Sequence, residues 1–269
     1  MTFLRKKTGL YDRKKREHNL RFLYSILAVI FIFGIIIAFA YFVLFSNFLK
    51  VKSTETSGLR IVSKDELVAN IKSTIISKSF LGSILGPDNI LFWKNNSGEV
   101  TFGEMLPKIS SVSINTDLKT RTVKLFANER IVYGVWCVSE TECFAFDSGG
   151  VVFSRVPTPE GVLLMKIENL NMRQPVLGSK FISNTDWIEN LFTTYEIMQK
   201  NNIPIEKIII KDYSLKEWEA ISPLRFSLYF SFDFIPDNLN LVLKNFFSRV
   251  DFNSLSYIDF RIPNRLFYK

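Results

Sequence analysis

The sequence predicts one N-terminal membrane-spanning helix followed by an α+β region of two domains. Two observations carry this prediction. Residues 22–45 contain no charged side chain over 24 consecutive positions. Beyond them, segments with an apolar residue at every second position alternate with segments whose apolar residues recur every three or four positions, which are the patterns of strands and of amphipathic helices.

The positive charge of the chain is concentrated before the apolar stretch. Residues 1–21 carry eight Lys or Arg residues against Asp12 and Glu17, a net charge of +6 out of the formal +8. A basic cluster in front of the first apolar helix keeps the N-terminus in the cytoplasm and interacts with anionic lipid. The basic balance therefore indicates a cytoplasmic tail and membrane lipid as its partner, and no nucleic acid.

Residues 22–45 are expected to form the membrane span. A helix of that length is roughly 36 Å long, enough to cross a hydrocarbon core of about 30 Å. The apolar part of a cleaved signal peptide has only about 7–15 residues and precedes a small-residue cleavage site. A buried core helix is disfavoured because the stretch has no polar face. The sequence thus predicts an uncleaved signal anchor that delivers the rest of the chain outside the cytoplasm.

Residues 46–129 predict a unit with the order strand, helix, helix, strand, strand. The alternation at 48–52 predicts the first strand. Alternation at 111–114 and at 123–127 predicts the last two strands, joined by a turn near Asp117. Two helices on a three-stranded sheet cover one of its faces and leave the other face for a contact.

Two capping boxes predict where the helices of this unit begin. Ser63 with Glu66 opens the first helix, and Thr101 with Glu104 opens a shorter one that ends at Pro107. The expected apolar stripe of the first helix consists of Leu67, Ile71 and Ile75.

Residues 130–269 predict a mixed, strand-rich domain with helices on one face. The clearest strand is at 226–234, where five large apolar residues occupy every second position. Helices are expected at 186–202 and, after an Asp237 cap, up to Val250. The other expected strands are at 132–138, 144–146, 151–153, 208–210 and 257–262.

The residue types of common catalytic and metal sites are missing from the part of the sequence beyond the predicted span. His18, the only histidine, lies in the basic tail, so no His-based metal site and no Cys–His or Ser–His pair is available outside the membrane. No spacing singles out a pair of carboxylates, and no phosphate-binding loop is present. We therefore expect a protein that is not an enzyme and that uses no cofactor or metal.

Cys137 and Cys143 flank the short connection VSETE. Across a hairpin their Cα atoms would come within disulfide range, about 5.5 Å, and such a pair oxidises outside the cytoplasm. A redox-active pair favours C-x-x-C and groups that stabilise a thiolate, which Glu140 and Glu142 oppose. We favour a structural disulfide, with a stabilisation on the order of 2 kcal/mol because the closed loop is short.

Four short motifs follow one another in a fixed order behind the signal anchor. They are a glycine turn and helix start at 58–67, ERIVYGVW at 129–136, FDSGGVVF at 146–153 and the ending YIDFR at 257–261. In this order the motifs resemble the FtsQ/DivIB family of bacterial cell-division proteins. The chain departs from the family at Ile131-Val132, where proline is common, and at Ile262, where many members have an aromatic residue.

The resemblance implies a fold and a function. Residues 46–129 would form a POTRA domain (the polypeptide-transport-associated fold, β-α-α-β-β), and residues 130–269 the family's β-domain. The protein would be a scaffold of the divisome in the bacterial cytoplasmic membrane at the septum. It would bind FtsB/DivIC-like and FtsL-like bitopic proteins outside the cytoplasm and couple them to septal cell-wall synthesis. The POTRA domain would contact other membrane division proteins.

The resemblance also implies where the partner binds. Relatives add a strand of FtsB to the sheet edge at the end of the β-domain. Arg261 is then expected to form a salt bridge with an acidic partner residue, so that Arg261→Glu weakens capture without changing thermal unfolding. Without the resemblance, Arg261 would be a solvated edge charge worth little. The expected binding residues are Tyr257, Asp259, Arg261, Leu266, Phe267 and Tyr268.

Two other functions are compatible with parts of the sequence. A POTRA-containing protein that escorts polypeptides across a membrane would usually carry several POTRA repeats and a barrel of many strands of about ten residues. A membrane-tethered cell-wall hydrolase would need catalytic groups that the sequence does not offer. The scaffold is favoured over both.

Overall fold

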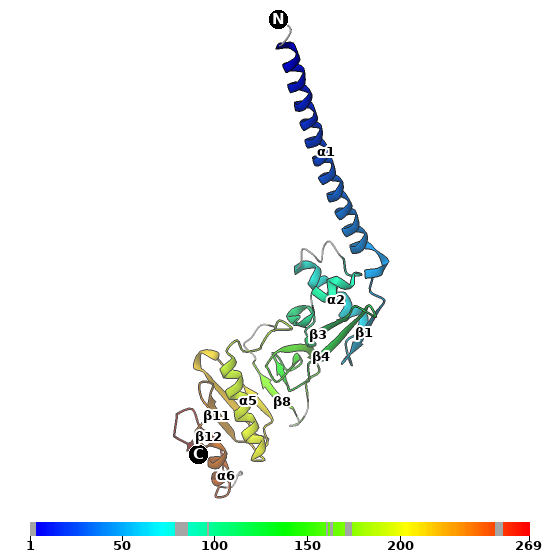
Figure 1. Ribbon diagram of the computed structural model, residues 1–269. Helices are drawn as coiled ribbons and strands as arrows, with labels where there is room; N and C mark the ends of the chain where they lie inside the picture. Colours follow the sequence, from blue (N-terminus) through cyan, green and yellow to red (C-terminus); the bar gives the residue numbers. More distant parts are fainter. Residues whose placement is uncertain are drawn as a thin grey trace. The chain divides into compact units, whose positions relative to one another are not determined.

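The structure is a computed structural model (Figure 1). It describes residues 4–78, 86–95, 97–159, 161, 164–169, 174–250 and 255–269. The chain divides into two compact units. One consists of Met1–Glu55, Ile71–Gly98 and Ile114–Leu125, and the other of Thr56–Asn70, Glu99–Ser113 and Phe126–Lys269. This division runs through the first sheet, whereas the strands of the two sheets separate between Glu129 and Gly134, close to the expected boundary at 129/130.

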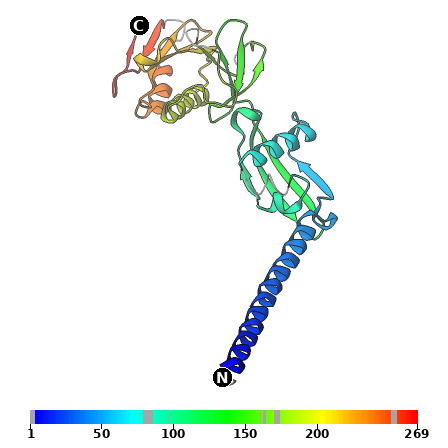
Figure 2. The ribbon, with the colours of Figure 1, turned by 90° about the horizontal axis from the view of Figure 1, so that it is seen from above.

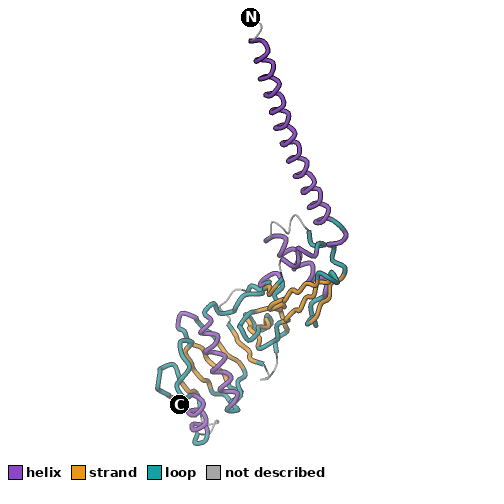
Figure 3. The backbone as a smooth tube through the Cα atoms, viewed as in Figure 1, coloured by secondary structure: helices purple, strands orange, loops and turns teal. Residues whose placement is uncertain are grey.

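Helix α1 (Leu4–Phe45) contains the only segment among the described residues that is long and apolar enough to cross a membrane, Phe22–Phe42. The side chains of this whole segment are exposed. Figure 3 shows α1 as one unbroken helix. The predicted apolar helix at 22–45 is therefore present, and it continues without a break into the basic tail.

The first sheet has four strands in the order β1-β4-β3-β2. They are β1 (Ser53–Ser57), β2 (Gly98–Val100), β3 (Ile109–Asp117) and β4 (Thr122–Glu129). The turn between β3 and β4 is closed by Asp117, whose carboxylate accepts hydrogen bonds from the N–H groups of Lys119 and Thr120. Val112, Ile114, Val123 and Leu125 are buried, as the alternation predicts.

The part of the chain that contains this sheet also contains helices α2 (Lys64–Lys78) and α4 (Ile90–Asn95). The Ser63 hydroxyl accepts a hydrogen bond from the N–H of Glu66, which is one half of the predicted capping box. Leu67 and Ile71 are fully buried, and Ile75 lies outside the side chains that the structure describes. The predicted helix start is therefore correct.

Two element predictions in this unit are wrong. Residues 48–52 form no strand: Asn47–Leu49 is a 3₁₀ turn (η1) capped by the Ser46 side chain, and the strand begins at Ser53. Strand β1 escaped detection because it is an edge strand with alternating exposed and half-buried residues and carries no large apolar side chain.

Among the residues that the structure describes, the helix that follows α2 in this unit is α4, and the segment after Thr101 is not a helix of the predicted kind. Residues Gly103–Met105 form a single 3₁₀ turn (η2) that begins at Phe102 without a side-chain cap. Helix α4 is instead opened by Asn89, whose side-chain oxygen accepts a hydrogen bond from the N–H of Leu91. The side chains of Phe92 and Trp93 in this helix are fully buried.

The second sheet has nine strands in the order β13-β12-β11-β10-β9-β8-β5-β6-β7. The pairs β5–β8, β8–β9 and β11–β12 are parallel, and the others with a given register are antiparallel. The strands are β5 (Gly134–Cys137), β6 (Cys143–Phe146), β7 (Val152–Val156), β8 (Met165–Glu168), β9 (Lys207–Ile209), β10 (Glu217–Ile221), β11 (Ser227–Ser231), β12 (Tyr257–Asp259) and β13 (Phe267–Tyr268).

Helices α5 (Thr185–Lys200) and α6 (Leu239–Phe247) pack on one face of this sheet (Figure 2). One row of side chains on that face runs across five strands in register: Ile167, Ile208, Ala220, Leu228 and Ile258. All five are fully buried in one core with α5 and α6. The period-two pattern at 226–234 and the apolar face of α5 thus have the burial that the sequence predicts.

The cap predicted for α6 is wrong. Asn238, and not Asp237, precedes the helix, with a left-handed backbone (φ 53°) and no side-chain hydrogen bond to the first turn. Asparagine adopts this conformation more readily than aspartate or larger residues because its short amide bonds locally. The helix is held instead by the burial of Leu239 and Leu243.

A candidate partner-binding edge

Strand β13 is the last strand of the nine-stranded sheet and has a single neighbour, β12. The main chains of Tyr257 and Lys269 exchange hydrogen bonds in both directions, each 3.2 Å long. In an antiparallel pair, the residues next to such a hydrogen-bonded pair turn their N–H and C=O groups to the opposite side of the strand. The main-chain groups of Tyr268 therefore point away from β12, toward the outer side of the sheet.

The side chains of this edge lie on two different faces. Tyr268 is paired with Ile258 and lies on the helix side, where its ring meets Phe246 edge to face at 5.0 Å between centroids. Phe267 is paired with Asp259 and lies on the open face. Tyr268 remains 57% exposed and Phe267 46% exposed, whereas Leu266 packs against the core. The edge therefore offers aromatic surface beside main-chain groups.

Arg261 follows β12 and is held by two carboxylates of the same chain. Its guanidinium donates from Nε to Asp259 at 2.9 Å, from one terminal nitrogen to Asp259 at 2.6 Å, and from the other to Glu217 at 2.8 Å. It also lies over the ring of Tyr229, 5.1 Å from the centroid. The bonds to Asp259, and then to Glu217, raise the pKa of Arg261.

Asp259 is the residue that positions Arg261. It accepts the main-chain N–H of Arg261 at 2.9 Å in addition to the guanidinium, and its side chain is more buried than that of Glu217. Burial opposes the charged carboxylate, but the bonds from Arg261 outweigh this effect, and the pKa of Asp259 is lowered. Asp259 and Arg261 act as one rigid pair, and the salt bridge to a partner acid stays a prediction.

The structure brings Tyr257, Asp259 and Arg261 together on the open face. The ring of Tyr257 lies 6.2 Å from that of Tyr229. A hollow of about 100 Å³ opens beside Arg261. Its lining residues are Ile209, Lys211, Asp212, Leu215, Glu217, Trp218, Glu219, Tyr229 and Arg261.

Sequence reasoning missed Glu217 and Tyr229 as members of this cluster. Both lie on strands that the chain reaches 28 or more residues before β12, and only the strand order brings them beside it. The register pairs Tyr229 with Glu219 on one side and with Asp259 on the other. Tyr229 could have been found from the sequence only by predicting this strand register.

The open face of the sheet is lined with ion pairs. Glu168 pairs with Lys166 and Lys207 at 2.9 Å each, and Glu219 with Lys211 at 2.8 Å. Burial raises the pKa of both carboxyl groups, but the bonds from the lysines outweigh it and lower the pKa overall. The carboxylates of Glu168 and Glu219 on this face are therefore paired with lysines of the same chain. The edge at β13 instead offers main-chain groups and aromatic rings.

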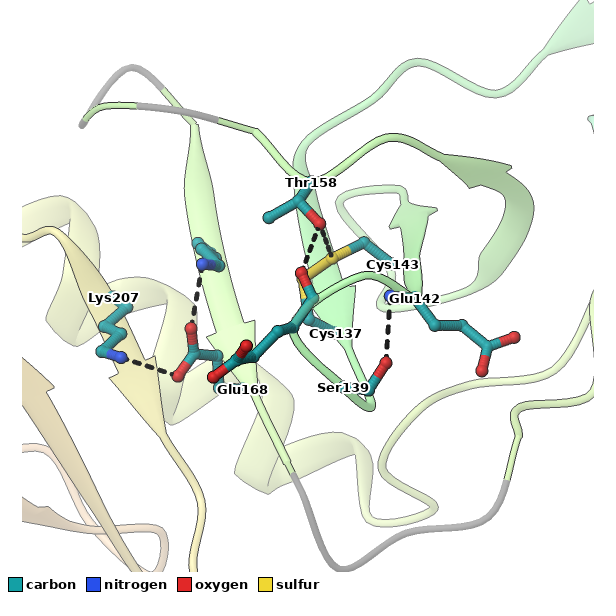
Figure 4. The surroundings of a disulfide bond; sticks show 9 residues. Cys137, Ser139, Glu142, Cys143, Thr158, Glu168 and Lys207 are labelled. Carbon is teal, nitrogen blue, oxygen red and sulfur yellow. Dashed lines mark hydrogen bonds and ion pairs between the residues drawn. A yellow bond between two sulfur atoms is a disulfide. The ribbon is translucent and has the colours of Figure 1, made fainter.

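Cys137 and Cys143 are joined by a disulfide (Figure 4). They are directly opposite each other in the β5–β6 hairpin and are fully buried. Thr158 lies against the bond: its hydroxyl is 3.4 Å from the sulfur of Cys143 and donates to the carbonyl of Glu140 at 2.7 Å. The pair closes the end of the hairpin and lies at the far end of the sheet from β13.

The motif residues Glu129, Arg130 and Asp147 are structural. Glu129 accepts the main-chain N–H groups of Arg60, Ile61 and Val62 at 2.9–3.0 Å. Burial raises the pKa of Glu129, but these bonds outweigh it and the pKa is lowered.

Arg130 donates to the carbonyl of Pro107 and forms a close ion pair with Asp147, and both side chains are mostly buried. Asp147 in turn accepts the N–H groups of Gly149 and Val151, each at 2.9 Å, which closes the β6–β7 turn. These motifs therefore fix the backbone and do not form a reactive site.

Among the residues that the structure describes, no three His, Cys, Asp or Glu side chains lie close enough to hold a metal ion. No model of a known protein family matches the chain. No curated protein matches it at a significant level.

Proposed function

We propose that this protein is a single-pass, FtsQ-like scaffold of the divisome, with its N-terminus in the cytoplasm and residues 46–269 outside. It binds FtsB/DivIC-like and FtsL-like bitopic proteins by accepting a partner strand at β13, and so couples them to septal cell-wall synthesis. The observation that carries the proposal is the outer side of β13, where the main-chain groups of Tyr268 face no neighbouring strand within the described part of the chain.

Strand addition suits this edge for three reasons. A bare edge supplies N–H and C=O groups for the partner's main chain. The exposed rings of Phe267 and Tyr268 supply apolar contact on the two faces of the added strand. Neither residue of β13 is Lys or Pro, so no charged side chain stands on the strand itself and both of its main-chain N–H groups are present. These features favour a protein partner over a small ligand.

The paired Asp259 and Arg261 beside this edge suit the selection of register. Their geometry is fixed before any partner arrives, because Asp259 holds the guanidinium through two nitrogens and the main chain. A partner carboxylate that reaches Arg261 has to share or replace the bond to Glu217, which is the more exposed of the two acids. The guanidinium of Arg261, already held in place by Asp259, would therefore favour the alignment of the partner strand that brings an acidic residue beside it.

The proposal is tested by crosslinking in cells. A photoreactive residue at position 266 is expected to capture a small bitopic coiled-coil protein. Capture of secretory clients would support the polypeptide-escort function instead, and capture of nothing but glycan would support a wall hydrolase.

A pair of variants tests the main chain itself. Tyr268→Pro removes the outward N–H and keeps the bonds to the chain before and within β12, because these are made by the main chain of Lys269 with Ser256 and Tyr257. Tyr268→Ala removes the same ring but keeps the N–H. Capture is expected to fall much further in Tyr268→Pro than in Tyr268→Ala, with both proteins folded by circular dichroism. Equal capture by the two variants would exclude strand addition at this edge.

A further inference from the structure

The β3–β4 turn lies against the point where α1 ends. Arg121, at the end of the turn, donates a hydrogen bond from its guanidinium to the carbonyl of Asn47 at 3.0 Å. Its own carbonyl accepts the N–H of Lys52 at 2.9 Å. Both bonds lie within the first compact unit. The turn is therefore fixed to the segment that connects the apolar helix to β1.

The distance along the chain places this turn at the depth of lipid headgroups. The uncharged apolar stretch ends at Phe45, and Asn47 follows two residues later. Two residues cover at most about 7 Å even when extended, and the headgroup layer on each side of a bilayer is roughly 5–8 Å thick. A turn that touches Asn47 therefore lies within or directly above this layer when α1 spans the membrane.

The exposed side chains at this place have the composition of a lipid-facing surface. Phe48 is 77% exposed and Leu118 is 41% exposed, so both offer apolar surface on this side of the unit. Lys50, Lys52 and Lys119 are exposed around them, together with the partly exposed Arg121. Basic residues that surround exposed apolar ones favour the surface of an anionic bilayer.

Two of the acidic residues nearby are already engaged. The carboxylate of Asp117 accepts the N–H groups of Lys119 and Thr120 within the turn. The side-chain hydrogen bond from Thr120, and then these two main-chain bonds, lower the pKa of Asp117. Asp88 lies 3.9 Å from Lys72. Glu55, three residues after Lys52, is also exposed. Four cations against these three anions still leave an excess of positive charge on the surface formed by Phe48, Lys50, Lys52 and 118–121.

We propose that this surface, which we name the juxtamembrane patch, docks on anionic phospholipid headgroups of the outer leaflet and holds the first sheet against the membrane. The inference rests on the membrane-spanning role proposed for α1. Leu118 and Phe48 enter the interface, while Lys50, Lys52, Lys119 and Arg121 contact phosphate groups. The patch is distinct from the basic tail, which lies at the opposite end of α1.

The test uses the full-length protein reconstituted in vesicles, with a fluorescent label on Leu118→Cys. The native cysteines are joined in a disulfide and do not react with the label. In vesicles that contain phosphatidylglycerol, nitroxides on lipid headgroups are expected to quench this label strongly. In vesicles of phosphatidylcholine alone, or at high salt, most of the quenching is lost, since each basic residue contributes about fivefold to binding an anionic surface.

Charge variants separate the patch from overall charge. Lys50→Glu with Lys119→Glu is expected to lose most of the quenching in anionic vesicles. The matched control, Lys108→Glu with Lys244→Glu, changes the net charge equally at exposed positions elsewhere and retains it. Equal quenching in all of these proteins, or none in the parent, would overturn the docking.

A second label shows which premise fails. On Ile32→Cys, in the middle of the apolar segment, the label is quenched by nitroxides deep in the acyl chains if α1 spans the bilayer. Deep quenching at residue 32 without headgroup quenching at residue 118 overturns the patch alone. Absence of deep quenching overturns the proposed span, and with it the docking.

Discussion

Glu129 shows how a single carboxylate can organise a loop. It gathers three consecutive main-chain N–H groups from residues 60–62, more than 65 positions earlier in the chain. Bonds to a charged acceptor are stronger than neutral ones, and groups left without the acceptor lose that stabilisation. The segment between β1 and α2 therefore depends on the charge of one side chain.

Glu129→Gln is expected to lower the free energy of unfolding by about 1–2 kcal/mol, in the lower part of the range for charged hydrogen bonds because the carboxylate is partly exposed. The folded-state pKa of Glu129 is lower than its ordinary value of 4.5. The stabilisation is thus complete above about pH 4.5 and is lost as the pH falls through the folded pKa.

Urea unfolding of both proteins from pH 7 down to pH 3 measures this effect. The difference between the parent and Glu129→Gln should shrink as the pH falls below 4.5. A difference that is constant over the whole pH range would show that the charge of Glu129 is not what holds residues 60–62.

The ion pairs of Arg261 change the effect that Arg261→Glu is expected to have on unfolding. Reversal of a solvated edge charge would leave unfolding unchanged, but Arg261→Glu places a third carboxylate beside Asp259 and Glu217. We expect it to lower the free energy of unfolding by about 2 kcal/mol through lost bonds and like-charge repulsion.

Glu217→Gln is the gentler probe of this cluster. It removes only the outer, half-exposed ion pair, so its cost should be well under about 1 kcal/mol. Thermal unfolding of both variants, next to the parent, measures the difference. If Arg261→Glu unfolds at the parent's temperature, the ion pairs contribute no stability.

At the scale of elements, the sequence predicted those whose burial follows one clear period. Strand β11 and helix α5 were predicted because their apolar residues face a single core. Strand β1 was missed because its burial alternates only between half-buried and exposed, and α4 because six residues are too few for a helical period to show. The edge position of β13 was predicted, whereas Glu217 depends on strand order, which single-strand patterns do not contain.

The disulfide in the β5–β6 hairpin gives a prediction for one element. The loop that it closes is short, because Cys137 and Cys143 have a sequence separation of only 6. Reduction, or Cys137→Ala with Cys143→Ala, is expected to cost on the order of 2 kcal/mol and to leave the protein folded.

Urea unfolding with and without a thiol reductant measures this cost. The double alanine variant should be insensitive to reductant, which makes it the control. Loss of all structure on reduction would mean that the hairpin holds the whole sheet together.

At the scale of the whole molecule, topology is the open prediction. A cysteine that replaces Thr8 or Lys108 is the single free thiol of its variant, because the native pair is joined. A small membrane-impermeant maleimide is expected to label position 108 in intact cells and position 8 only after permeabilisation. Labelling of position 8 in intact cells would reverse the proposed orientation.

The bonds of Lys269 have a practical consequence for anyone who modifies this protein. The carbonyl of Lys269 accepts the N–H groups of both Ser256 and Tyr257, so the final residue is held within the sheet. A tag or fluorescent domain fused after it would start next to the outer side of β13 and would compete with an incoming strand. Fusions at the opposite terminus leave that side accessible, and assays of complex formation are best made with them.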